Sequence, residues 1–141
     1  GNALRMFNVY GSRSYNVGRS NSAYSPVIGI FNHQRKSGMP LTITGSGKQS
    51  RDFVHVHDVA RALLMAAESG VAGNIFNLGC GESHSINTIA DLISPEKQYI
   101  PGRPNEALVT HAAISKIRDL IGWKPAITLR EGLTQLDDGD R

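Results

Sequence analysis

Short apolar runs alternate along the chain with segments in which apolar residues recur every three or four positions. A short apolar run between turn residues is typical of a buried β-strand, and the longer spacing is typical of an amphipathic helix. The runs predict strands over residues 3–7, 41–44, 53–56, 74–78 and 98–100. Helices are expected in the intervals between them, and this alternation predicts an α/β fold.

The first two predicted helices have recognisable starts. One is expected over residues 25–37, with Pro26 in its first turn. The next is expected to begin at Asp58, acting as the N-cap, and to continue to about Glu68. Its apolar stripe predicts four buried side chains, those of Val59, Leu63, Ala66 and Ala67.

Three later helices also carry signals at their ends. Gly122 is expected to close a helix over residues 114–121. Thr128 and Glu131 have the spacing of a capping box and predict the start of the last helix. Ser85 is expected to cap a helix that buries Ile86, Ile89, Ala90 and Ile93.

Two segments lack either pattern. Residues 8–24 are polar, and a loop of that length in a compact domain is either functional or disordered. Residues 137–140 are polar and are expected to fray. Since no linker or repeat divides the chain, we expect residues 1–141 to form a single domain.

Composition narrows the possible functions. The 141 residues are 40% hydrophobic and 19% charged, which is ordinary for a globular protein. A net charge of +3 is too small to suggest nucleic acid binding, although it suits an anionic small ligand. The single cysteine, Cys80, excludes an internal disulfide and suits the cytoplasm. No apolar run approaches the ~18 residues of a membrane span, so no membrane contact is expected.

Residues with catalytic or metal-binding chemistry form no complete set. His55 and His57 are two residues apart and would share one face if both lay on a strand, but His57 and Asp58 are better explained as a helix start. No acidic or thiol ligand stands at a known spacing, and we expect no metal. No motif of a catalytic nucleophile is present. Gly79 and Gly81 follow a strand without the third glycine of a dinucleotide-binding loop.

Three polar residues are candidates for ligand contacts. The guanidinium groups of Arg51 and Arg103 could donate paired hydrogen bonds to phosphate oxygens, although most arginines only solvate a surface. Asn8 follows a predicted strand, where α/β sheets place ligands, although an asparagine there also suits a turn.

Six motifs, in order, resemble the C-terminal half of the extended short-chain dehydrogenases/reductases, the NAD-dependent nucleotide-diphosphate-sugar epimerases and dehydratases. They are L-R-M-F-N-V-Y-G at 4–11, Y-S-P-V-I at 24–28, P-L-T-I-T-G-S-G-K-Q-S-R-D-F-V-H-V at 40–56, I-F-N-L-G at 75–79, R-P-N-E at 103–106, and S-K-I followed by L-I-G-W-K-P at 115–125. The resemblance implies a partial doubly wound, Rossmann-like domain that forms the substrate-binding portion of that fold. It also implies that the strands over 4–7 and 75–78 are parallel neighbours.

The resemblance implies a site for a UDP-sugar or another NDP-sugar. Asn8 would bind the diphosphate, Arg51 and Arg103 would pair with phosphate oxygens, and Glu106 would accept hydrogen bonds from the ribose. The backbone of Leu41, Thr42 and Ile43 would lie against the edge of the base, with Val27 and Ile28 packed nearby.

Some positions depart from the family pattern. Ser46 stands where aspartate is usual, His57 where an acid is common, and Asn105 where glycine is usual. Asparagine tolerates positive φ, so the turn at Asn105 is expected to survive. No tyrosine has a lysine four residues later, so the family's catalytic Tyr-Lys pair is not found here. Together with the missing glycine loop, this predicts no catalytic residue and no NAD-binding residue in these 141 residues.

We therefore expect the nucleotide-sugar-binding portion of a cytoplasmic epimerase or dehydratase similar to UDP-glucose 4-epimerase. By itself this portion would be catalytically incomplete, since the NAD-binding part of the family would lie outside it. The alternatives are a non-catalytic binding or assembly module and a fragment with no separate role. A strand at 4–7 with one unpaired edge, beside apolar faces, predicts a homo-oligomer.

Overall fold

The computed structural model describes residues 1–15 and 26–136, and these form an α/β structure. Its strands are β1 (Ala3–Met6), β2 (Asn8–Tyr10), β3 (Leu41–Thr44), β4 (Ser50–Arg51), β5 (Phe53–His55), β6 (Ile75–Leu78), β7 (His84–Ser85) and β8 (Lys97–Ile100). Its helices are α1 (Val27–Lys36), α2 (Val56–Glu68), α3 (Ile86–Ile93), α4 (Ser115–Ile121) and α5 (Leu129–Thr134).

The described strands pair two by two. β1 with β6, β2 with β5, and β3 with β8 are parallel, whereas β4 and β7 are antiparallel. In the first pair Leu4 lies opposite Phe76, so the predicted neighbourhood of these two strands is confirmed. Each parallel pair joins segments that are far apart in the sequence, with at least one helix between them.

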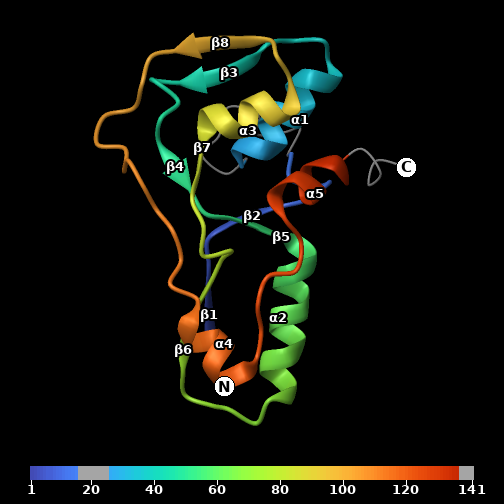
Figure 1. Ribbon diagram of the computed structural model, residues 1–141, viewed down its shortest axis with the longest axis vertical. Coiled ribbons are helices and arrows are strands. Elements are labelled where there is room, and N and C mark those ends of the chain that lie inside the picture. The colour runs from blue at the N-terminus through green and yellow to red at the C-terminus, as the bar shows by residue number, and fades with distance from the viewer. Residues whose placement is uncertain (16–25, 137–141) are drawn as a thin grey trace.

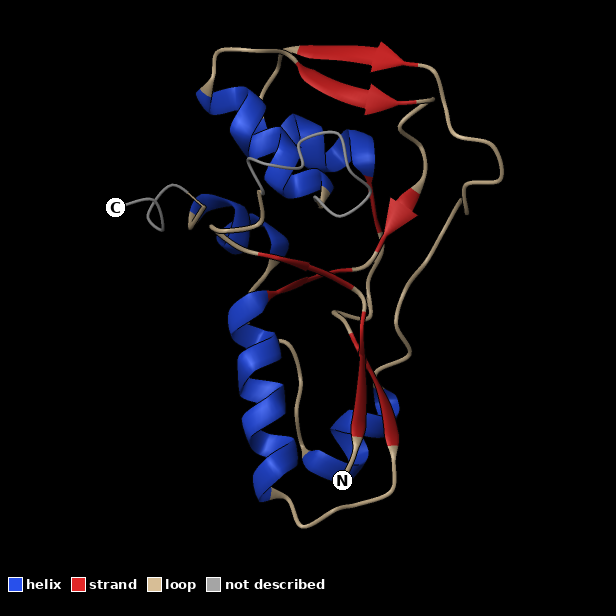
Figure 2. Ribbon diagram, turned by 180° about the vertical axis from the view of Figure 1, so that it is seen from behind, coloured by secondary structure: helices blue, strands red, loops and turns tan. Residues whose placement is uncertain are grey.

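The molecule is elongated, and the β2–β5 pair crosses its middle (Figure 1). On one side lie α1, α3, β3 and β8, and on the other lie β1, β6, α4 and most of α2 (Figures 1 and 2). Each side has its own core of buried side chains. Side chains alternate across a strand, so Phe53 of β5 enters one core and Val54 enters the other. The β2–β5 pair therefore connects the two halves.

Local signals at several helix ends are confirmed. The Ser85 hydroxyl accepts a hydrogen bond from the Thr88 N–H and caps α3, whose Ile86, Ile89 and Ala90 are buried. The Thr128 hydroxyl caps α5 through the Glu131 N–H. Gly122 ends α4 with a left-handed φ of 82°.

Other expectations were wrong. Residues 8–10, assigned to a loop, form β2, because their backbone pairs with β5 although Asn8 and Tyr10 are not apolar. The cap of α2 is His55 and not Asp58, because the His55 ring accepts the hydrogen bond of the His57 N–H. Leu63 and Ala67 are exposed, since the buried stripe of α2 follows Val59, Ala62 and Ala66.

Some expectations concern residues outside the described ranges. They are the helix start at Ser25, the residue Tyr24 of the second motif, the part of the predicted loop over 16–24, and the polar run over 137–140. Among the residues that the structure describes, no helix is long and apolar enough to cross a membrane.

Candidate functional site

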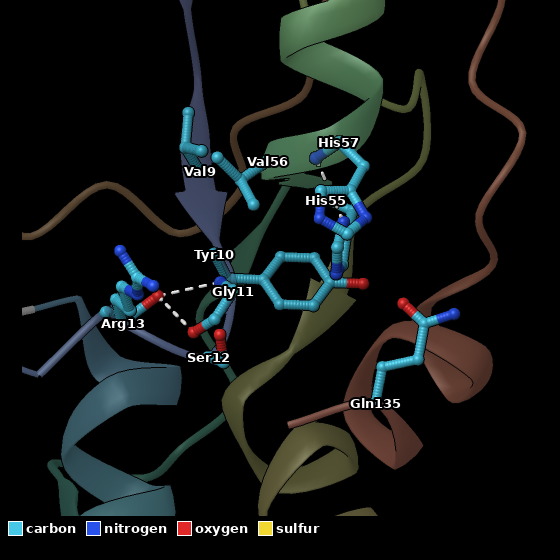
Figure 3. A pocket seen from close by; sticks show the side chains of 10 residues that line it. Val9, Tyr10, Gly11, Ser12, Arg13, His55, Val56, His57 and Gln135 are labelled. Atoms are coloured by element: carbon cyan, nitrogen blue, oxygen red, sulfur yellow. Dashed lines mark hydrogen bonds between the residues drawn. The ribbon is translucent and has the colours of Figure 1, made fainter. Parts of the chain in front are cut away.

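A cavity near the centre of the molecule, lined by described residues, has a volume of about 730 Å³. It opens where the parallel strands β2 and β5 end and α2 begins, which is where α/β proteins place ligands (Figure 3). Its lining residues are Val9, Tyr10, Gly11, Ser12, Arg13, Ser14, His55, Val56, His57 and Gln135. Apart from Val9, Val56 and Gly11, these residues have polar side chains, although the Ser14 hydroxyl is already bonded to the backbone of Gly11.

His55 contributes a buried imidazole to this cavity. Its Nδ1 accepts the hydrogen bond of the His57 N–H at 3.1 Å, which requires a neutral ring with its proton on Nε2. Burial, helped by the neighbouring His57 ring at 4.7 Å between centroids, lowers the pKa of His55. The nearby Asp58 carboxylate opposes that shift in pKa. His55 is therefore a neutral ring in the wall of the cavity near pH 7, with its proton on Nε2.

Tyr10 forms the floor beside His55, with the two ring planes nearly perpendicular. Its side chain is buried, and burial raises the pKa of the hydroxyl far above its ordinary value. The hydroxyl abuts Gly132 of α5, where a Cβ atom would collide with it. Tyr10 is consequently a fixed, neutral part of the cavity wall.

Asn8 lies one residue before the cavity lining and is tied to β5. Its backbone N–H and its side-chain amide both donate to the carbonyl of Asp52, at 3.2 and 3.0 Å. The side-chain oxygen and the second amide hydrogen of Asn8 have no role in these two bonds and can still meet a ligand. The expected contact of Asn8 with a diphosphate remains a prediction.

The structure brings Arg51 and Glu106 together although they lie on separate segments. The Arg51 Nη2 atom is 3.2 Å from the Glu106 carboxylate, and Nη1 donates to the Ser50 carbonyl at 2.8 Å. Both side chains are partly exposed. A guanidinium has five N–H donors and a carboxylate several acceptor positions, so the pair retains capacity for a ligand.

Arg103 lies in the exposed loop after β8. The turn that follows includes Asn105, whose φ of 60° confirms that asparagine adopts the left-handed conformation there. Among the described contacts, none joins Arg103 to Arg51 or Glu106. Arg103 is thus on the same loop as Glu106, with its side chain turned to solvent.

The residues expected near the base lie at the opposite side of the β2–β5 pair from α2. Ile28, Leu41 and Ile43 are fully buried there, and Val27 packs against them. The Thr42 N–H donates to the Gln34 side-chain oxygen, and the Gln34 amide donates to the Thr42 hydroxyl. Gln34 therefore occupies part of the β3 edge that was expected to face the base.

Two buried carboxylates were not identified from the sequence. Asp52 accepts hydrogen bonds from the N–H groups of Cys80, Gly81 and Ala112. Asp58 accepts from the N–H groups of Ala126 and Ile127, and from Arg61. In the sequence, Asp52 and Asp58 are simply acidic residues within the strand and helix patterns. Their hydrogen-bond partners are backbone N–H groups far along the chain, which no sequence pattern indicates.

The loop after β6 does not have the free N–H groups of a dinucleotide-binding loop. A dinucleotide-binding loop needs free N–H groups after a strand. After β6, the N–H groups of Cys80 and Gly81 both donate to the Asp52 carboxylate. In the same ranges, no group of three or more histidine, cysteine, aspartate and glutamate side chains could hold a metal ion.

Comparison with known proteins gives consistent matches. The family model of the NAD dependent epimerase/dehydratase family matches residues 2–79, which is more than half of the chain. UDP-glucuronic acid decarboxylase 1 of Danio rerio is 33% identical over 138 residues, which cover 93% of this chain and 31% of that protein.

Solved structures agree in fold. The UDP-glucose 4-epimerase of Thermotoga maritima, solved with UDP-glucose, superposes with a TM-score of 0.86 at 31% identity, covering 97% of this chain and 44% of that one. The UDP-glucuronic acid 4-epimerase of Bacillus cereus, solved with UDP-glucuronic acid and NAD, gives 0.81 at 32% identity, covering 96% and 43%.

The chain thus spans less than half the length of these relatives. Its parallel strands and helices match a part of their Rossmann-like fold, as the sequence predicts. From the family model and these structures together, the chain belongs to the NAD-dependent epimerase/dehydratase family.

Proposed function

We propose that this chain is the part of a sugar epimerase or dehydratase that binds the nucleotide sugar, with a UDP-sugar as its ligand. The observation that carries the proposal is the Arg51–Glu106 pair, a cation and an anion that meet at 3.2 Å at the edge of the fold. A guanidinium suits phosphate oxygens, and a carboxylate suits the hydroxyls of a ribose. One ligand that presents both groups is a nucleoside diphosphate.

Two features support this ligand class. Asn8 and the central cavity adjoin each other, so a diphosphate near Asn8 would direct its sugar toward the cavity. Two related structures contain UDP-glucose and UDP-glucuronic acid. We place the diphosphate on Arg51, Arg103 and Asn8, the ribose on Glu106, and the base along Leu41–Ile43 beside Val27 and Ile28.

We propose that no residue of this chain carries out the chemical step on the nucleotide sugar. No tyrosine here is followed by a lysine at the fourth position, and the N–H groups after β6 are occupied. We propose that the chain binds a nucleotide sugar in the cytoplasm, as one domain, and does not turn it over by itself.

A second candidate is an assembly module without catalysis. Exposed apolar side chains on α2 and β6, among them Leu63, Leu64 and Ile75, favour contact with another polypeptide. We propose a second copy of this chain as that partner, which gives a homo-oligomer.

Calorimetry with the pure chain tests the proposed function. UDP and UDP-glucose should bind, and free glucose should bind more weakly, because the assigned contacts address phosphate, ribose and base. NAD should not be retained through gel filtration, and UDP-glucose should not be epimerised. Absence of UDP binding would contradict the proposed site, and turnover by the chain alone would contradict the assignment of a purely binding role.

A further inference from the structure

Asp52 is a fully buried carboxylate in the short segment between β4 and β5. Its Oδ1 accepts from the Cys80 N–H at 2.6 Å, and its Oδ2 accepts from the N–H groups of Gly81 at 2.8 Å and Ala112 at 2.9 Å. No lysine, arginine or histidine side chain is bonded to it in the described structure. The charge is therefore balanced by backbone dipoles of two remote loops.

The backbone of the same residue holds a third segment. The Asp52 carbonyl accepts both the N–H and the side-chain amide of Asn8. One residue thus connects β2, the loop after β6 and the segment around residue 112. The space is closely filled, since a Cβ atom at Gly79 would lie 2.8 Å from Oδ2 and 2.7 Å from Ala112.

The segment anchored at Ala112 carries Glu106 toward Arg51. The Ser50 N–H donates to the Leu108 carbonyl at 2.7 Å, and the Thr110 N–H donates to the Ser50 carbonyl at 3.0 Å. Residues 108–112 consequently lie along residues 50–52, held at one end by the Asp52 carboxylate. The position of Glu106 relative to Arg51 follows from that alignment.

We propose that Asp52 is the positioning residue of the nucleotide-sugar site. It aligns Asn8, Arg51 and Glu106 without touching the ligand itself. This inference rests on the proposed function, because it assigns those three residues to the same ligand.

A matched control exists in the same molecule. Asp58 is also buried and also accepts N–H groups of a remote segment, those of Ala126 and Ile127, but it connects α2 to the chain before α5. In Asp52→Asn and Asp58→Asn, the new amide group turns an N–H toward backbone N–H groups and loses the charge. Both variants should therefore be less stable, and only one should disturb the site.

The test compares the two variants in the full chain. UDP affinity is measured by calorimetry at a temperature where both remain folded by circular dichroism. Asp52→Asn should weaken UDP binding by about tenfold or more, and Asp58→Asn by less than about twofold. In Asp52→Asn, replacing Arg51 with alanine should then cost much less affinity than it does in the wild type. Equal UDP affinity of the two aspartate variants would overturn the proposal.

A second measurement separates this proposal from the proposed function. The Arg51 Nε–H resonance reports the geometry of the Arg51–Glu106 pair without any ligand, and amide exchange reports the Ala112 N–H. Both should change in Asp52→Asn and stay as in the wild type in Asp58→Asn. If the wild type does not bind UDP, the proposed function fails, while an unchanged Arg51 resonance in Asp52→Asn would overturn the positioning role separately.

Discussion

Arg51 has more donors than its partners in the protein use. Its Nη1 and Nη2 atoms are bonded to the Ser50 carbonyl and the Glu106 carboxylate. The remaining donors belong to a planar fork that matches two phosphate oxygens. A point charge could replace the attraction of Arg51 for Glu106 but not this paired geometry.

Replacing Arg51 with alanine should weaken UDP binding by about 1.5–3 kcal/mol, the scale of a hydrogen bond to a charged group. Calorimetry at fixed salt measures the change. Arg118→Ala is the matched control, because Arg118 is an exposed arginine on α4 that also faces a carboxylate, that of Asp119 at 3.6 Å. UDP affinity that is the same in Arg51→Ala and Arg118→Ala would exclude a role for Arg51.

At the scale of elements, α2 begins with an unusual cap. The ring of His55 replaces the small polar side chains that ordinarily accept the first N–H groups of a helix. Only the neutral ring can do so, because protonated Nδ1 is a donor. The start of α2 is therefore linked to the protonation of one buried histidine in the wall of the cavity.

The pKa of His55 lies below its ordinary value of 6.5 in the folded protein. At a pH between the lowered pKa of the folded protein and the ordinary pKa of the unfolded chain, the unfolded chain binds more protons than the folded protein. The free energy of unfolding therefore falls as the pH decreases below about 6.5. Urea unfolding at pH 7.5 and pH 5.5 should show this loss. His55→Asn, which keeps a capping side chain, should make the loss smaller.

Replacement of His111 serves as the control, because His111 is exposed and lies outside the helices. His111→Asn should leave the pH dependence as in the wild type. A pH dependence that is identical in His55→Asn and the wild type would show that the cap is not linked to this titration.

At the scale of the whole molecule, the half that contains β1 and β6 has a strand edge without a partner among the described strands. Ala3 and Phe7 donate their N–H groups toward β6 and its flanks, so those of Leu4 and Met6 face the other edge of β1. No other described strand pairs with that edge. Leu63 and Leu64 of α2 are 45% and 59% exposed, and Ile75 is 55% exposed. Such a surface favours association.

The chain should therefore form dimers or larger species at micromolar concentration, as light scattering would show. Leu64→Lys should shift the mass toward the monomer, because a buried lysine at the contact costs free energy. Met39→Lys replaces a side chain of similar exposure, 50%, in the other half of the molecule and should leave the mass unchanged. A wild-type monomer would contradict the proposed assembly.

Expectations from the sequence were good where the signal was local. Ser85, Thr128 and Gly122 act within one turn of their own helices, and the structure confirms all three. The pairing of β1 with β6 was also expected, through the family resemblance.

Expectations were poor where the partner is remote. The polar sequence around Asn8 does not indicate that these residues pair with β5. The sequence around Asp52 likewise does not indicate that the Ala112 N–H donates to its carboxylate. Leu63 and Ala67 have the spacing of a core stripe with Val59, but the side of α2 that packs inward carries Val59, Ala62 and Ala66. The contact between Arg51 and Glu106, which are 55 residues apart, likewise follows only from the structure.

The parallel pairing of distant segments also has a kinetic consequence. Ala3 pairs with Ile75, Asn8 with Phe53, and Leu41 with Lys97. Each of these three parallel ladders therefore closes a long loop before it gains its first hydrogen bond. The chain loses the entropy of loop closure before the hydrogen bonds and packing of the ladder can compensate for that loss. Proteins dominated by contacts between distant segments fold in roughly milliseconds to seconds. Helix α2 can form on its own timescale, whereas the β2–β5 pair, which joins both cores, must await chain segments from each side. During that delay the apolar faces are accessible, which makes synthesis and refolding the periods when this chain most needs dilution or a chaperone.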